Sequence, residues 1–320
     1  MRRGIVLATL PALAALAATP AAADSNDLVL SRLGTRLTDS MGNLTGVVGD
    51  NVEFRSLASQ LGVALAPHLL TPADSIGFSG FQMTVDYSTT TIDSGAAYWR
   101  ALQGAPPSAL QTVGFFARKG MWFPVPSFEV GAGAVHLVDS RTWTGQLYAK
   151  LSLHEGYHDL PLPSLSARGA VSRMMTQHEL DLTVASLDIA VSKHVGIGGT
   201  WRLDPFAGWD LLMIVPRSEV IDPTPNVDPL TPGNEMDSLN NFVFKDQDNI
   251  YRQRLFLGAK LQYYVFQLTL EVQFALAGSS IDDRAGTSTA CTPMSATADC
   301  DAKDTAKAQR TFSLSAGFDF

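Results

Sequence analysis

The chain ends in RTFSLSAGFDF, where apolar and polar side chains alternate. Phe312, Leu314, Ala316, Phe318 and Phe320 would share one face of a strand, and the residues between them are polar or small. Because successive side chains of a strand point to opposite faces, this period of two predicts a strand with one apolar and one polar side.

Residues 250–264 alternate in the same way over a greater length. Tyr251 and Tyr263 fall on the apolar face, whereas the opposite face carries Arg252, Arg254 and Lys260. At about 3.3 Å per residue the two tyrosines lie roughly 40 Å apart, and a tilt of about 40° projects this distance to roughly 30 Å. That height matches an apolar membrane band between two aromatic girdles.

Other segments repeat the alternation. Residues 266–276 follow it closely, and a looser version occurs in 81–88, 111–118, 128–138, 143–153, 165–171, 180–191 and 201–213. The segment 180–191 changes phase near Ala185, which we interpret as a bulge. The connections 215–249 and 278–308 are long, whereas 195–200 and 264–266 are short. About ten strands with long and short connections in alternation predict an up-and-down barrel.

The first 23 residues have the pattern of a secretory signal peptide. Arg2 and Arg3 precede the apolar run 4–18, and three alanines ending at Ala23 stand before Asp24, which predicts cleavage there. Cleavage removes two basic residues and takes the formal charge from −8 to −10, so nucleic-acid binding is not expected. In an exported chain we expect Cys291 and Cys300 to form a disulfide.

The terminal strand resembles the last strand of Gram-negative outer-membrane β-barrels, which end in an aromatic residue that the barrel-assembly machinery reads. The signal peptide and the strand pattern extend this resemblance. It implies an all-β fold, a transmembrane antiparallel up-and-down barrel of about ten strands located in the cell outer membrane. Its implied partners are outer-membrane lipid, lipopolysaccharide and, during biogenesis, the assembly machinery. A secreted β-sandwich is the alternative.

The predicted strands assign residues to the lumen and to the girdles. The aromatic girdle would comprise Trp143, Trp201, Tyr251, Tyr263, Phe318 and Phe320. The lumen cations would be Lys150, Arg168, Arg202, Arg252, Arg254 and Lys260, and the lumen acids Asp86, Asp188, Asp204, Asp210, Glu271 and Asp319. In a barrel only slightly wider than the eight-stranded kind, balanced charges would pair and close the lumen. A selective pore would more naturally carry one sign in excess.

Residues 24–76 precede the barrel, which we place at 77–320. Within them a helix is expected, with Asp50 or Asn51 as its cap, Glu53 in its first turn and Pro67 at its end. It would either plug the lumen or lie against the periplasmic rim. A plug before a barrel is similar in architecture to the long-chain fatty-acid transporter type, which passes hydrophobic compounds through a longer chain with more strands. No binding residue is carried across.

The sequence also contains a possible zinc motif, H-E-x-x-H, at His154, Glu155 and His158. On a helix this spacing would bind zinc. The residues before it alternate with period two, and on a strand the two histidines would lie roughly 13 Å apart, too far to share one metal. Pro161 also follows too closely for a continuing helix. We therefore expect a turn at the periplasmic mouth, with no metal, cofactor or catalytic residue.

Three functions remain open. We expect a porin-like channel or transporter for small hydrophobic solutes. The alternative is a structural or adhesin-type barrel with a closed lumen that presents its outer loops, and the third is a barrel enzyme.

Overall fold

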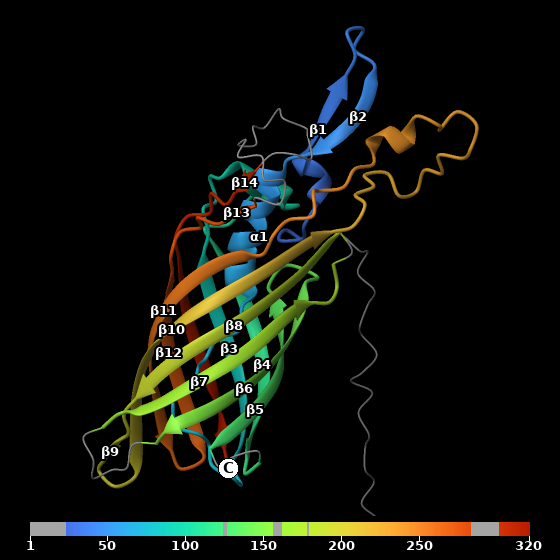
Figure 1. Ribbon diagram of the computed structural model, residues 1–320. Coiled ribbons are helices and arrows are strands. Elements are labelled where there is room, and N and C mark those ends of the chain that lie inside the picture. The colour runs from blue at the N-terminus through green and yellow to red at the C-terminus, as the bar shows by residue number, and fades with distance from the viewer. Residues whose placement is uncertain (1–23, 124–126, 156–161, 178, 283–300) are drawn as a thin grey trace, which may run out of the picture.

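Ten strands form a closed antiparallel barrel (Figure 1). The computed structural model describes residues 24–320 except 124–126, 156–161, 178 and 283–300. The predicted signal peptide and the predicted disulfide lie outside the described residues. The barrel strands are β3 (Phe81–Thr91), β4 (Ala109–Met121), β5 (Phe128–Leu137), β6 (Trp143–His154), β7 (Ser164–Met174), β8 (Leu180–Ser192), β10 (Trp201–Ser218), β11 (Ile250–Tyr263), β12 (Phe266–Ala275) and β15 (Gln309–Asp319).

Each barrel strand pairs with the barrel strands that come before and after it in the chain. The short strand β9 (Val195–Ile197) is additional and pairs with the start of β10. The first barrel strand, β3, pairs with the last, β15, and this pairing closes the barrel. The all-β barrel of about ten strands predicted from the alternation is therefore confirmed. We call the end with the connections 92–108, 219–249 and 276–308 the loop end, and the opposite end, where Phe320 lies, the turn end.

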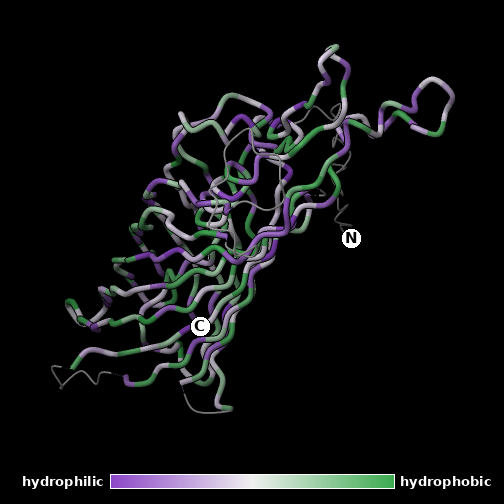
Figure 2. Tube along the Cα trace, turned by 45° about the horizontal axis from the view of Figure 1, so that its top comes forward, coloured by the Kyte–Doolittle hydropathy of each residue, from purple (hydrophilic) through white to green (hydrophobic). Residues whose placement is uncertain are grey.

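The barrel is apolar outside and polar inside. Figure 2 shows hydrophilic and hydrophobic residues alternating along the strands. On β11 the outward Leu255 and Leu257 are 51% and 62% exposed, whereas the inward Arg252 and Arg254 are 2% and 1% exposed. This is the reverse of a soluble protein and is typical of a barrel whose outer wall is covered by lipid.

The bulge predicted near Ala185 is wrong. β8 keeps a continuous register with both of its neighbours, β7 and β10, and its burial alternates without a break. Near the loop end its inward positions are Leu180, Leu182 and Val184, each buried. The sequence pattern changes phase because the inward face itself changes from polar to apolar where it meets a helix inside the barrel.

That helix, α1 (Asn51–Leu65), lies in the lumen near the loop end (Figure 1). Asp50 caps it, because its side chain accepts hydrogen bonds from the backbone N–H groups of Val52 and Glu53 at 3.1 and 3.0 Å. The helix stops before Pro67, as expected from the sequence. In the described residues, no helix has the length and apolar character needed to cross a bilayer.

The residues before α1 lie at the loop end. They form η1 (Leu30–Leu33) and a hairpin of β1 (Gly34–Thr38) and β2 (Leu44–Gly49), which projects from the barrel beside the connection 219–249 (Figure 1). The sequence did not predict this hairpin. After α1, residues 66–80 run through the lumen to the turn end, where β3 begins; we call them the threaded segment. The remaining short elements at the loop end are η2 (Ala97–Ala101), η3 (Asp237–Asn240), β13 (Ile281–Asp282) and β14 (Ala302–Lys303).

Candidate functional site

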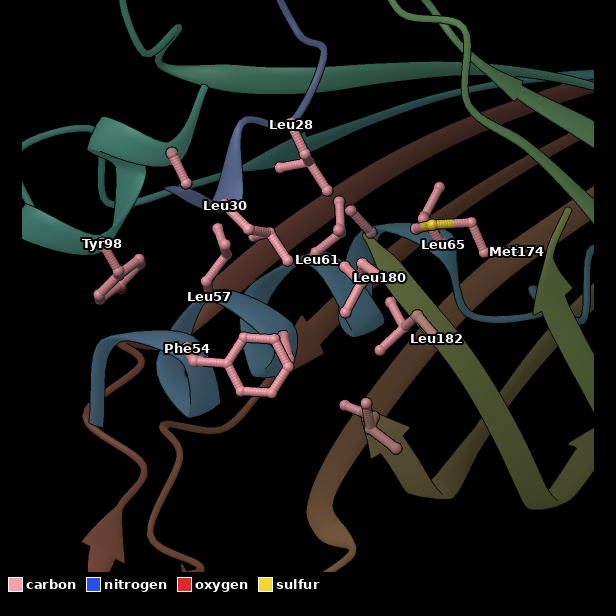
Figure 3. Close-up of a cluster of buried hydrophobic side chains, with 14 of the residues drawn as sticks. Leu28, Leu30, Phe54, Leu57, Leu61, Leu65, Tyr98, Met174, Leu180 and Leu182 are labelled. Atoms are coloured by element: carbon pink, nitrogen blue, oxygen red, sulfur yellow. The ribbon is translucent and has the colours of Figure 1, made fainter. Parts of the chain in front are cut away.

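The lumen near the loop end is an apolar core around α1. Figure 3 shows Leu57, Leu61 and Leu65 of the helix facing the same cluster as Leu180 and Leu182 of β8. All five side chains are at most 2% exposed. Further inward members of this cluster come from other strands: Leu110, Leu137, Met174, Leu212, Ile214 and Ile250. The wall is therefore apolar where the helix touches it.

Hydrogen bonds fasten α1 to the connections of the loop end. Arg55, fully buried, donates to the carbonyl of Asp248 at 2.8 Å and to the hydroxyl of Ser280 at 3.0 Å. Ser59 donates to Asp304 at 2.6 Å and accepts from Arg252 Nη1 at 2.6 Å. The helix is thus bound to the connections 219–249 and 276–308, and through Arg252 of β11 to the wall.

Ion pairs fill the middle of the lumen. Arg168 Nε donates to Asp188 Oδ2 at 2.7 Å, and Arg254 Nε donates to Asp210 Oδ2 at 2.7 Å. Lys150 Nζ lies 3.0 Å from a carboxylate oxygen of Glu129. All six side chains are at most 2% exposed. Because a buried charge without a partner is costly, each of these cations is held by a carboxylate.

The same cations also bind the threaded segment. Arg254 Nη2 donates to the carbonyl of Pro67 at 2.6 Å, and Arg168 Nη1 donates to the carbonyl of His68 at 2.7 Å. Lys150 Nζ donates to the carbonyl of Asp74 at 3.0 Å. A chain that crosses the lumen without secondary structure needs partners for its backbone carbonyls, and the wall cations supply them. These contacts hold the threaded segment against the wall inside the lumen.

The structure places the predicted lumen residues on the inner face. Ten of them are at most 5% exposed: Asp86, Lys150, Arg168, Asp188, Asp204, Asp210, Arg252, Arg254, Lys260 and Glu271. Arg202 lies at the turn-end mouth, with 38% of its side chain exposed. The sequence interpretation omitted two inward charges, Arg118 and Glu129, which are 2% and 0% exposed. Both sit at polar positions of the predicted alternation and could have been found from it.

A polar cavity of about 360 Å³ opens at the turn end. Three cations line it, Lys150, Arg202 and Lys260, together with Asp74 and Asp319. Lys260 pairs with Asp319 at 2.8 Å, and Arg202 lies 3.6 Å from Asp74. The charges of this mouth are therefore largely compensated by its own carboxylates.

The predicted girdle residues lie on the outer wall near its two ends. At the turn end, Trp201 and Tyr263 have ring centroids 4.5 Å apart, and Phe318 packs beside Phe266 at 5.1 Å. Phe320 is at the same end. At the loop end Trp143 and Tyr251 are 46% and 52% exposed.

The zinc motif does not form a helix in its described part. His154 is the last residue of β6 and is exposed, and His158 lies outside the described residues. Glu155 accepts hydrogen bonds from the backbone N–H and the hydroxyl of Ser75, at 3.2 and 2.6 Å. Its observed role is to hold the threaded segment at the turn end. Within the described part of the chain, no group of three or more His, Cys, Asp or Glu side chains has a metal-binding arrangement.

Searches with family models and against curated proteins gave no match. Among solved structures, the chain is similar to the attachment invasion locus protein Ail of Yersinia pestis, at 10% identity and a TM-score of 0.26, over 76% of this chain and 99% of that one. It is also similar to an outer-membrane channel from Pseudomonas putida F1, at 12% identity and a TM-score of 0.32, over 78% of this chain and 98% of that one. The similarity to OmpT, an outer-membrane protein of Vibrio cholerae, has 8% identity and a TM-score of 0.25, over 67% of this chain and 56% of that one.

The barrel of this chain is established by its own strand pairing, which β3 and β15 complete. None of the three structures is a fatty-acid transporter by its description. They therefore do not support the architectural likeness to the long-chain fatty-acid transporter type that the sequence suggested.

Proposed function

We propose that this chain is an outer-membrane β-barrel that is closed by its own N-terminal segment and presents a surface structure at its loop end. The apolar outer wall and the charged interior support membrane insertion. We name the surface structure the crown and define it as the β1–β2 hairpin together with the connection 219–249. Of the functions that the sequence left open, the lumen supports the closed barrel best.

The energy needed to withdraw α1 argues against a channel that opens spontaneously. Leu57, Leu61 and Leu65 are each at most 1% exposed. Burial of one leucine contributes about 1.5–3 kcal/mol, so exposing these three costs about 4.5–9 kcal/mol. Every 1.4 kcal/mol is a factor of ten, so an open form would be populated in fewer than about one molecule in a thousand. The ion pairs around the threaded segment lower this population further.

The observation that carries the proposal is that α1 supports the crown. Phe54 of the helix stacks on Phe244, with ring centroids 4.3 Å apart, and Phe244 packs edge-on against Phe242 at 5.3 Å. These two rings also fill the space beside Gly34 and Gly49, at the base of the hairpin. The plug, the hairpin and the connection 219–249 therefore share one aromatic cluster.

The outer parts of the crown are free for contact. Met41 at the hairpin tip is 82% exposed and Leu230 in the connection is 89% exposed. A base packed by aromatic rings, with exposed tips, suits a protein that binds a partner outside the membrane. Long connections at one end and short ones at the other support placing the crown on the outer side.

Two measurements test this proposal. The first is conductance of the refolded full chain in planar bilayers, where we expect no channel steps; a chain without residues 24–71 serves as the conducting control. The second is a peptide tag inserted between Met41 and Gly42, which an antibody should reach on intact cells. A matched tag between Gly198 and Gly199, at the turn end, should react only after permeabilisation. Steady conductance of the full chain would refute the closed lumen, and the reverse labelling pattern would refute the orientation.

Solute transport is the second candidate, and the cavity at the turn end favours it. Its volume of about 360 Å³ accommodates a small molecule, and its lining includes Lys150, Arg202 and Lys260. The lining is polar, which suits a polar solute better than the hydrophobic one expected from the sequence. Steady full-chain conductance in the same experiment would favour this candidate.

A further inference from the structure

Two outward arginines stand just beyond the apolar band at the loop end. On β7 the outward residues end with Val171 and then Arg173, and on β10 they end with Val215 and then Arg217. Both arginines are exposed, whereas the residues before them in the chain, which point inward, are buried. The first polar position past an apolar band lies at the level of lipid headgroups.

The strand between them, β8, places one carboxylate next to both. Asp181 is directly opposite Arg217 in the register of β8 and β10, so their Cβ atoms are about 5 Å apart. Arg173 Nη2 lies 2.9 Å from Asp181 Oδ2 across the other edge of β8. Among the described residues, Arg217 forms no ion pair. The three side chains therefore form a group with two positive charges and one negative charge.

We propose that Arg173 and Arg217 bind the phosphate of an anionic lipid headgroup in the leaflet at the loop end. A guanidinium presents a planar set of N–H donors that matches a phosphate, and two such groups on neighbouring strands approach one phosphate from two sides. The 67% exposure of the Arg173 side chain leaves donors available beyond those that Asp181 occupies. Asp181 competes with the lipid for these donors.

This inference rests on the proposed membrane insertion, because only an inserted barrel holds these arginines at headgroup height. In water, an exposed arginine pair binds phosphate weakly and is screened by salt. In a membrane, lipid headgroups are at high local concentration and fixed at the right level. The site is therefore assigned to a lipid phosphate and not to a free phosphate ion.

Arg310 offers a matched control. It is exposed, follows the same outward pattern at the loop end of β15, and lies opposite Phe274 of β12. No second outward arginine stands at the facing position of either neighbouring strand, where Phe274 and Thr91 are found. Replacing it removes one rim charge without touching the proposed site.

The test measures retention of phosphatidylglycerol, against phosphatidylcholine, by the full chain released from mixed micelles into a native mass spectrometer. The Arg173→Gln/Arg217→Gln variant should retain about tenfold less phosphatidylglycerol, since two charge-assisted contacts are lost. Arg310→Gln should retain as much as the wild type. Asp181→Asn should retain more, because it removes the competing carboxylate; a merely structural ion pair predicts no gain.

Three results with the variants would overturn the proposal: undiminished retention in the double variant, an equal loss in Arg310→Gln, or unchanged or reduced retention in Asp181→Asn. Displacement of the lipid by inorganic phosphate at equal concentration would point to a free-phosphate site instead, against the proposal. Heat-modifiable mobility of every variant is checked in parallel. If the wild-type chain itself fails to fold into micelles, the proposed membrane function fails, and that result is distinct from any loss of lipid selectivity.

Discussion

Gly62 is the residue whose replacement tests most directly whether α1 lies against β10. A Cβ added at this position would lie 2.7, 2.8 and 2.9 Å from Cδ1, Cγ2 and Cγ1 of Ile214, which is fully buried. Ordinary carbon contacts are about 3.5–4.0 Å, so Gly62→Ala forces either the helix or Ile214 to move. The expected result is a loss of stability from overpacking.

Two effects of this substitution oppose each other. Alanine is favoured over glycine within a helix by about 1 kcal/mol. Overpacking a close-packed core costs about 1–3 kcal/mol. We therefore expect Gly62→Ala to lower the free energy of unfolding by about 0–2 kcal/mol.

The second step is a double-mutant cycle with Ile214→Ala, which removes all three crowded atoms. That substitution alone should cost about 2–5 kcal/mol. In its background Gly62→Ala should become stabilising by about 1–2 kcal/mol, because the helix preference remains and the new methyl group fills part of the cavity. The sign of the effect at position 62 reverses between the two backgrounds, with a coupling of about 1 kcal/mol or more.

Urea unfolding of the refolded chain in detergent, followed by far-ultraviolet circular dichroism and heat-modifiable mobility, measures the four corners of this cycle. The control is Gly95→Ala with Ile214→Ala, because Gly95 has no positive φ and nothing lies within 4 Å of a Cβ there, so no coupling is expected. Additive effects of Gly62→Ala and Ile214→Ala would refute the packing of α1 against β10 and, with it, the closed lumen.

Three further predictions follow from the buried contacts. Arg254→Met leaves Asp210 buried without its partner and should lower the free energy of unfolding, measured in urea, by about 3–5 kcal/mol. Adding Asp210→Leu should restore most of this stability. No recovery in the double variant would contradict this account. Burial raises the pKa of Asp304 above its ordinary value of 3.8, so its contribution to stability is present at low pH and is lost as pH rises through the raised value. Asp304→Asn should reduce the fall in the free energy of unfolding that occurs above about pH 4. An unchanged dependence of this free energy on pH would contradict the assigned role of Asp304. Phe244→Ala removes the ring stacked on Phe54. Proteolysis of the connection 219–249 should then be faster, while the heat-modifiable mobility of the barrel persists. Protection equal to that of the wild type would show that other contacts hold the crown.

The strands could be predicted from the sequence because each carries its own signal. The final strand shows this best: its apolar positions from Phe312 to Phe318 face outward and are exposed, and Ser313 and Ser315 face inward and are buried. A period of two is a local property of a strand in a wall with lipid on one side and polar contents on the other. The cap at Asp50 and the stop before Pro67 are equally local, so α1 was also expected with its bounds.

The same local signals could not reveal what fills the barrel. The pattern at Leu180, Leu182 and Val184 predicts a shifted register only if the lumen is polar throughout. Their inward direction makes sense only once α1 is inside. The hairpin also escaped prediction, since its packing depends on Phe242 and Phe244, about 200 residues later in the chain.

The sequence by itself therefore determined the wall: a barrel of ten alternating strands with charges inside and aromatic residues at its ends. Only the tertiary structure decided that α1 and the threaded segment enter from the loop end and occupy the lumen. It also decided which cation meets which carboxylate, such as Arg254 with Asp210 and Lys150 with Glu129. The physical reason is that alternation acts between neighbours in the chain. The filling of the lumen instead depends on contacts of α1 and the threaded segment with strands that lie far from them in sequence.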